Sequence, residues 1–287
     1  MKERETQDVV TPLTVSDGAG VRLQRSIATP TLDNLDPFFL FDNFGSERPD
    51  DYLAGFPMHP HRGIETVTYM VDGSVTHRDS LGNEGTIGAG DVQWMTAGSG
   101  ILHEEMPHAG PRRLDGFQVW VNLPRKLKMA TPRYQDVPSA RIPELTASGG
   151  ARVRVIAGKV DGVEGAVREI FAGPSYLDVT LPAGATFEQP ITRGHTALLY
   201  VYRGRLDVAG KPVPSPRLAI LGDGDVVRVR AGASDARFLV LSAQPLEEPA
   251  VRWGPFVMNS EDEIRQALWD LRQGTFVKTR PAGAVVH

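Results

Sequence analysis

The fold is decided by the stretch MHPHRGIETVTYMVDG, which covers residues 58–73. Its second part, Ile64 to Val71, is rich in β-branched residues, and Asp72-Gly73 is a favoured hairpin turn. Ser74 to His77 then begins a return strand. Similar short runs, separated by Gly, Pro, Asp and Asn, fill most of the chain. The sequence therefore predicts an all-β protein.

The first part of the same stretch carries two histidines, His59 and His61, separated by one proline. Side chains two residues apart on a strand point to the same face, so these imidazoles should converge. The segment Ile101 to Glu105 repeats the arrangement with His103 and Glu105. A closed barrel would bring the two pairs together, and three nitrogen donors with one carboxylate predict a mononuclear metal site.

A second carboxylate competes for the fourth ligand position. Glu65 lies four residues beyond His61 and has the same strand parity, so parity alone does not choose between Glu65 and Glu105. Four such ligands complete a tetrahedral zinc site, but they leave two positions open in an octahedral iron, manganese, nickel or cobalt site. The remaining histidines are assigned to structural or surface roles: His77, His108, His195 and His287.

Composition restricts the chemistry further. The 287 residues include no cysteine, so disulfides and thiolate metal sites are excluded and any metal must bind nitrogen and oxygen. A net charge of -4 without a basic run argues against direct nucleic-acid binding. There is no long apolar run and the first residues are polar, so we expect no membrane span and a cytoplasmic location. We also expect a monomer.

Two sequence matches indicate that the fold is duplicated. Tyr69 to Gly73 matches Tyr200 to Gly204, and Gly88 to Val92 matches Gly222 to Val226. The spacing of these matches predicts which residues of the second half correspond to the four proposed ligands. His59 and His61 correspond to Pro190 and Thr192, and His103 and Glu105 correspond to Arg237 and Leu239. The second half is therefore expected to keep the scaffold without the metal.

The segment between the halves, Pro124 to Gly150, is rich in Pro, Lys, Arg and Ser and has weak periodicity. This composition is typical of a linker. We therefore expect a metal-binding domain with its linker at residues 1–146 and a metal-free domain at residues 147–287.

The end of the second domain changes from strand to helix periodicity. Ser260 and Glu263 form a capping box, and apolar residues follow at helical spacing, namely Ile264, Ala267, Leu268 and Leu271. The sequence predicts a short C-terminal helix that stops at Gly274.

Three segments resemble the pirin family of the cupin superfamily. They are residues 36–44 (DPFFLFDNF), 58–69 (MHPHRGIETVTY) and 90–103 (GDVQWMTAGSGILH). The likeness covers residues 20–125 and is looser afterwards; Thr96 departs from the general cupin motif in a way that pirins share. It implies a bicupin, with two double-stranded β-helix (jelly-roll) barrels packed face to face, a short C-terminal helix, and metal in the first barrel alone.

The same resemblance implies a metal and an activity. It implies iron, as Fe(II), bound by residues matching His59, His61, His103 and Glu105, and so favours Glu105 over Glu65; Mn, Ni, Co, Cu and Zn are alternatives. Some pirins are similar in activity to quercetin 2,3-dioxygenases, which use O2 to open the central ring of a flavonol and release carbon monoxide. Other pirins act through protein partners.

Two main hypotheses follow. In the first, the protein is a dioxygenase of a flavonol such as quercetin, with Glu105 as the catalytic base that takes the substrate proton. Apolar residues beside the ligands are candidates for the pocket lining: Met58, Trp94, Met95 and Met106. In the second, it is a non-enzymatic iron-binding regulatory protein that binds a transcription factor or a metabolic enzyme. A cupin acting on another small aromatic or sugar substrate is a third.

Overall fold

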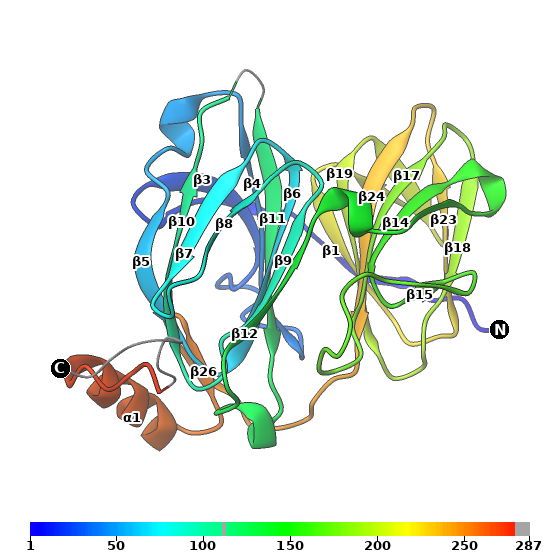
Figure 1. The fold of residues 1–287 in the computed structure, drawn as a ribbon. Helices are drawn as coiled ribbons and strands as arrows, with labels where there is room; N and C mark the ends of the chain where they lie inside the picture. The colour runs from blue at the N-terminus through cyan, green and yellow to red at the C-terminus, as the bar shows by residue number, and fades with distance from the viewer. Residues whose placement is uncertain (111–112, 279–287) are drawn as a thin grey trace. The chain divides into compact units, whose positions relative to one another are not determined.

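The strands form two barrels, and the described residues contain one α-helix (Figure 1). The computed structural model describes residues 1–110 and 113–278. Contacts divide the chain into two compact units. One unit contains Thr14–Asn34, Phe38–Ser139 and the chain from Leu246 onward, and is called the first barrel; the other contains Met1–Leu13, Leu35–Pro37 and Ala140–Pro245, and is called the second barrel.

The first barrel consists of two antiparallel sheets. The larger sheet has the strand order β12 (Arg133–Val137), β9 (Val92–Thr96), β6 (Ile64–Asp72), β11 (Leu114–Asn122), β4 (Phe38–Ser46), β3 (Val21–Ile27) and β2 (Leu13–Asp17). The smaller sheet has the order β5 (Phe56–His61), β10 (Ile101–Pro107), β7 (Val75–Asp79) and β8 (Glu84–Ile87). One apolar cluster contains residues of both sheets, for example Met70 and Val75, so the two sheets pack against each other.

The second barrel repeats this strand order. Its larger sheet runs β1 (Thr6–Val10), β22 (Arg217–Leu221), β19 (Thr196–Arg203), β24 (Ala236–Ala243), β17 (Ser175–Leu181), β14 (Arg152–Ala157) and β13 (Glu144–Thr146). Its smaller sheet runs β18 (Thr186–Pro190), β23 (Val226–Ala231), β20 (Arg205–Val208) and β21 (Lys211–Pro214). The predicted duplication is confirmed by this shared topology.

Short elements complete the description. Two hairpins pair β15 (Lys159–Val160) with β16 (Val163–Glu164) and β25 (Val251–Trp253) with β26 (Phe256–Met258). The 3-10 turns are η1 (Pro49–Asp51), η2 (Arg125–Leu127), η3 (Ser139–Arg141) and η4 (Ser148–Gly150), and the helix is α1 (Glu261–Arg272). No helix within the described residues is long and apolar enough to cross a membrane.

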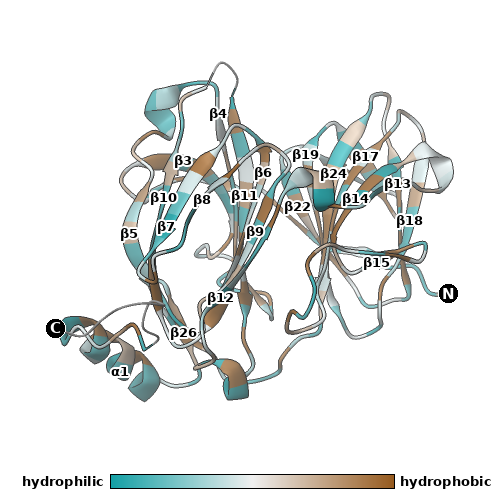
Figure 2. Cartoon of the chain, in the orientation of Figure 1, coloured by the Kyte–Doolittle hydropathy of each residue, from teal (hydrophilic) through white to brown (hydrophobic). Residues whose placement is uncertain are grey.

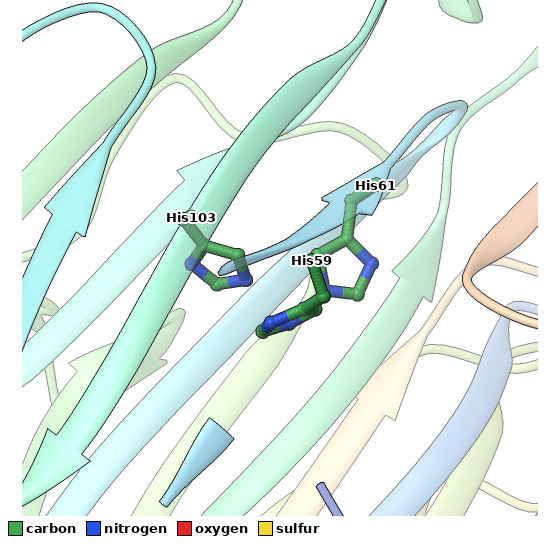
Figure 3. A group of neighbouring side chains, drawn as sticks. All are labelled: His59, His61 and His103. Carbon is green, nitrogen blue, oxygen red and sulfur yellow. The ribbon is translucent and has the colours of Figure 1, made fainter. Parts of the chain in front are cut away.

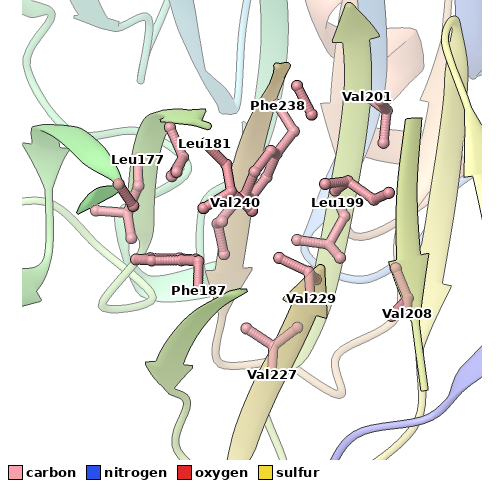
Figure 4. Close-up of a cluster of buried hydrophobic side chains, with 14 of the residues drawn as sticks. Leu177, Leu181, Phe187, Leu199, Val201, Val208, Val227, Val229, Phe238 and Val240 are labelled. Atoms are coloured by element: carbon pink, nitrogen blue, oxygen red, sulfur yellow. The ribbon is translucent and has the colours of Figure 1, made fainter. Parts of the chain in front are cut away.

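The interior of the second barrel is filled with apolar side chains from both of its sheets (Figure 4). Phe187 on β18 meets Phe238 on β24 with ring centroids 6.0 Å apart, and Val227 and Val229 of β23 are buried in the same cluster. This alternation of inward apolar residues with outward polar ones is what closes a barrel around a dry core.

The segment predicted as a linker is instead structured. Within Pro124 to Gly150, β12 pairs with β9 in the first barrel and β13 pairs with β14 in the second. Both are short outer strands of their sheets, and their mixed polar composition hides the period-2 pattern. The chain passes from one unit to the other after Ser139.

The helix α1 is confirmed, but its placement in the second domain is corrected. Ser260 accepts a hydrogen bond from the Glu263 backbone N–H, as the capping box predicts. The helix is amphipathic (Figure 2), and Ile264 and Ala267 pack with Phe256 in the first unit. The N-terminal strand β1 conversely belongs to the second barrel. Each unit therefore contains one end of the chain from the other half of the sequence, and the predicted division at residues 1–146 and 147–287 did not anticipate this.

Candidate metal centre

Three histidines converge inside the first barrel (Figure 3). His59 and His61 lie at the end of β5, and β10 runs antiparallel to it with His103 directly opposite His59. The ring centroids lie 4.9 Å apart for His59 and His61, 4.4 Å for His59 and His103, and 5.0 Å for His61 and His103. One nitrogen of each ring lies within 4.8 Å of the other two.

The hydrogen bonds of these rings leave nitrogens free for a metal. The Nδ1 atoms of His59 and His61 lie 2.9 Å and 3.3 Å from the carbonyl oxygens of Pro57 and Pro255. With Nδ1 protonated and donating to these carbonyls, Nε2 is the lone-pair nitrogen of each ring, and the two Nε2 atoms lie 3.1 Å apart.

The third histidine supports the same conclusion. Neither ring nitrogen of His103 has a hydrogen-bond partner among the described residues, although the side chain is buried. Burial lowers the pKa of both His103 and His61 well below the ordinary histidine value, and neighbouring imidazoles lower it further. Neutral, buried imidazoles with unused lone pairs fit a divalent cation, because the metal would satisfy polar atoms that are otherwise costly to bury.

Glu105 lies on the same strand, two residues after His103, and is also buried. Its Oε1 accepts a hydrogen bond of 2.8 Å from the hydroxyl of Thr68 on β6. It lies outside the group of mutually close ligand atoms formed by the three histidines. Its roles as fourth ligand and as base therefore stay predictions.

Glu65 points to the opposite face of the larger sheet from Thr68, because the two residues differ in parity along the regular strand β6. Its Oε1 accepts a hydrogen bond of 2.7 Å from Thr96, and burial raises its pKa to about 7. The parity argument for Glu65 assumed one continuous strand from His61 onward. Gly63, with a φ of +81°, breaks the strand between β5 and β6 and resets the alternation. This geometry favours Glu105.

A cavity of about 610 Å³ lies beside the histidines and is lined by His59, His61 and Glu105. Its apolar walls come from both sheets of the first barrel, with Val21, Leu23, Leu40, Phe44 and Trp120 from the larger sheet and Phe56 and Val75 from the smaller one. The size and the mixed walls suit a small aromatic ligand.

The predicted pocket lining was wrong. None of the four residues proposed from their position beside the ligands lines this cavity, namely Met58, Trp94, Met95 and Met106. Met58 is 48% exposed because a residue next to an inward-pointing histidine points outward, whereas Trp94 and Met95 are buried away from the cavity.

Two contributions to the site were missed. His77 on β7, assigned to structure or surface, is buried with its ring centroid 5.2 Å from that of His103, and its Nε2 lies 3.4 Å from the Tyr134 hydroxyl. Thr68 holds Glu105. The signal for Thr68 was present, since Thr66 and Thr68 are polar residues that share one face of β6.

The second barrel has no histidine or carboxylate at the positions equivalent to the proposed ligands. These equivalent positions differ from the positions that the repeat spacing predicted. The strand pairings align β5 with β18 and β10 with β23, which places Gln189, Ile191, Val227 and Val229 opposite His59, His61, His103 and Glu105. The predicted positions were wrong because Gly88 to Val92 leads into β9, whereas Gly222 to Val226 leads into β23, the counterpart of β10.

Family models and known relatives agree with this architecture. The model of the pirin domain matches residues 20–121, and that of the pirin C-terminal cupin domain matches residues 176–277. A Pseudomonas aeruginosa protein, provisionally named a quercetin 2,3-dioxygenase, is 48% identical over 94% of this chain and 97% of its own. A pirin-like protein of Caulobacter vibrioides is 45% identical over 96% of this chain and 100% of its own.

A solved structure is also similar. The crystal structure of a quercetin 2,3-dioxygenase from Acinetobacter baumannii matches with a TM-score of 0.87 and 35% identity, covering 96% of this chain and 98% of that one. The bicupin architecture with a single helix is thereby confirmed. The chain belongs to the pirin family.

Proposed function

We propose that this protein is a metal-dependent dioxygenase that opens the central ring of a flavonol such as quercetin with O2. The observation that carries the proposal is the convergence of three imidazoles beside a cavity of about 610 Å³; His61 and His103 are buried, and His103 has no hydrogen-bond partner among the described residues. The names of the Pseudomonas and Acinetobacter relatives support the same chemistry.

His59, His61 and His103 would hold the metal, with Glu105 as the fourth ligand and Fe(II) as the proposed ion. When bound, the metal supplies positive charge that favours the deprotonated flavonol and a redox centre for O2. Carbonyl oxygens fix two of the imidazoles in one tautomer.

The chain itself would bind the substrate and move its proton. The Glu105 carboxylate would take the proton of the flavonol 3-hydroxyl, and the Thr68 hydroxyl would hold that carboxylate in place before and after the transfer. Leu40, Phe44 and Trp120 would pack against the flat rings and exclude water from the reacting atoms.

The test is turnover by the full chain. The protein is loaded with Fe(II) without air and mixed with quercetin; O2 is then added while flavonol absorbance and released carbon monoxide are followed. We expect one carbon monoxide per flavonol consumed and no turnover by His103→Ala. His195→Ala, which removes a histidine of the second barrel, serves as the matched control.

Absence of turnover with Fe, Mn, Ni, Co, Cu and Zn would refute the enzymatic proposal. If the metal were bound tightly but nothing turned over, the regulatory alternative would gain support. A cytoplasmic location and a monomeric state remain part of the proposal, and fractionation and light scattering test them.

A further inference from the structure

A row of polar side chains crosses the floor of the cavity in the first barrel. At directly paired positions on four neighbouring strands lie Thr68 on β6, Gln118 on β11, Asp42 on β4 and Arg25 on β3. All four line the cavity. Because neighbouring strands lie about 4.8 Å apart, this polar row extends roughly 14 Å from the position of Thr68.

The near end of the polar row is joined to the metal centre. Thr68 Oγ1 lies 2.8 Å from Glu105 Oε1 and 2.8 Å from Gln118 Oε1, and its one proton can be donated to either acceptor. The amide N–H groups of Gln118 donate to no residue within 1–110 and 113–278, so they are left as donors for a group in the cavity.

The far end of the polar row is a partly buried ion pair. Arg25 donates to Asp42 through Nε at 2.8 Å and Nη2 at 2.7 Å, and Nη2 also bonds Asp17. The side chains of Arg25 and Asp42 are 18% and 5% exposed. Nη1 of Arg25 has no hydrogen-bond partner among residues 1–110 and 113–278, so its two N–H groups are available to a ligand.

Burial raises the pKa of Asp42 to about 6, and the guanidinium of Arg25 opposes this shift. The carboxylate is therefore ionised at neutral pH and accepts hydrogen bonds through lone pairs that Arg25 does not use. A phenolic hydroxyl could donate to Asp42 and accept from Arg25 or Gln118, whereas a C–H or a methyl ether at the same place could not do both.

We propose that the polar row selects flat polyhydroxylated aromatic substrates by binding hydroxyl groups remote from the group held at the histidines. The inference rests on the proposed function and adds a substrate class and specificity residues to it. A single aromatic ring is too short to reach from the histidines to Arg25, whereas two or three linked rings span the row. The apolar walls then cover the ring faces, as the lining by Leu40 and Phe56 indicates.

The experiment compares two flavonols that differ only in remote hydroxyls. Quercetin and 3-hydroxyflavone share the 3-hydroxyl and the 4-carbonyl, but 3-hydroxyflavone has no other hydroxyl. Their affinities for the Fe(II)-loaded full chain are measured without O2 by quenching of tryptophan fluorescence. We expect quercetin to bind about tenfold to a hundredfold more tightly, as hydrogen bonds to charged groups predict.

The test variant is the double substitution Arg25→Met/Asp42→Leu, because Arg25→Met alone would leave Asp42 buried without its cation. It should lose most of the preference for quercetin and bind 3-hydroxyflavone as before. Gln24→Met is the matched control, since Gln24 is the neighbour of Arg25 on the other face of β3. If the double variant does not fold, Arg25→Lys, which keeps the charge but not the two-pronged contact, should lose part of the preference.

Equal affinity of the wild type for both flavonols, or no binding of either, would overturn the proposal. So would a loss of affinity for both ligands in the double variant by the same factor. Admitting O2 to the wild-type complex tests turnover separately. A protein that prefers quercetin without consuming it would refute the dioxygenase proposal and leave the polar row intact.

Discussion

Replacing Asp270 by leucine should release the helix α1 from the first barrel. Asp270 accepts a hydrogen bond of 2.8 Å from Arg62, the residue directly after His61, and the two side chains are 4% and 1% exposed. Arg62 also donates to the carbonyl oxygens of Ser99 and Phe276 at 2.8 Å and 2.9 Å. One guanidinium thus joins β5, the turn before β10, α1 and the chain after it.

The expected cost follows from burial of the charge. Removing one partner of a buried ion pair costs about 3–5 kcal/mol, because the other charge is left uncompensated. Asp270→Leu should therefore increase the opening of α1 about a hundredfold to a few thousandfold. Arg62→Met should cost less, because Asp270 keeps bonds of 2.8 Å from Lys278 and 3.0 Å from Gln266.

The pH dependence of this pair has a definite sign. Burial raises the pKa of Asp270, but bonds from Lys278, Arg62 and Gln266 outweigh it and hold the pKa at about 2, below the ordinary 3.8. A depressed carboxyl pKa contributes stability that is present above about 3.8 and is lost as the pH falls through about 2. The cost of Asp270→Leu should therefore be constant between pH 5 and pH 8.

Hydrogen exchange of the backbone amides of Glu261–Arg272 measures the opening of the helix. The double variant Arg62→Met/Asp270→Leu is the control, since apolar residues can replace a buried pair at little cost. It should exchange more slowly than Asp270→Leu alone. Two results would show that the ion pair does not hold the helix. In one, the loss of helix-opening free energy in the double variant equals the sum of the losses in the two single variants. In the other, Asp270→Leu leaves the hydrogen exchange of the helix unchanged.

Four further outcomes are expected. His103→Ala should remove both the bound metal, measured by elemental analysis, and flavonol turnover. Thr68→Val should weaken metal binding about tenfold by freeing Glu105, whereas substitutions of Glu65 should not, and competition with a chelator measures this. Burial raises the folded-state pKa of Glu65 from 4.5 to about 7, so its protonation stabilises the fold fully below about pH 4.5 and that stability is lost as the pH rises through 7. Glu65→Gln should therefore match the wild type in unfolding free energy at about pH 4 and exceed it by roughly 3 kcal/mol at pH 8. Phe187→Ala should destabilise the second barrel by about 3–5 kcal/mol in urea unfolding and leave metal content unchanged.

Strand parity predicted the histidine centre because it acts over two residues within one strand. His59 and His61 share β5, and His103 lies on the neighbouring β10, so no long-range information was needed beyond closure of a barrel. The same rule failed for Glu65, which lies beyond Gly63 and its positive φ. Parity holds along a strand and is lost at a break that the sequence marks by one glycine.

Strand parity could not predict the cavity, nor that each chain end belongs to the unit formed mainly by the other half of the sequence. Both depend on pairings between distant segments, such as β1 with β22 and Arg62 with Asp270. A polar edge strand and a polar linker have similar compositions, so β12 was hidden within the segment predicted as a linker. The local sequence pattern identifies the strands and the helix, whereas residues far along the chain determine which sheet or unit each of them joins.

The two barrels share a strand order and differ in what fills them, so the fold alone does not determine the site. Where β10 carries His103 and Glu105, β23 carries Val227 and Val229, and these valines lie in a continuous apolar core. The same inward positions thus support either a cavity with unsatisfied nitrogens or a dry packed interior. Since a buried imidazole without a partner is costly, the presence of His103 in the first barrel is itself the physical argument for a bound cation.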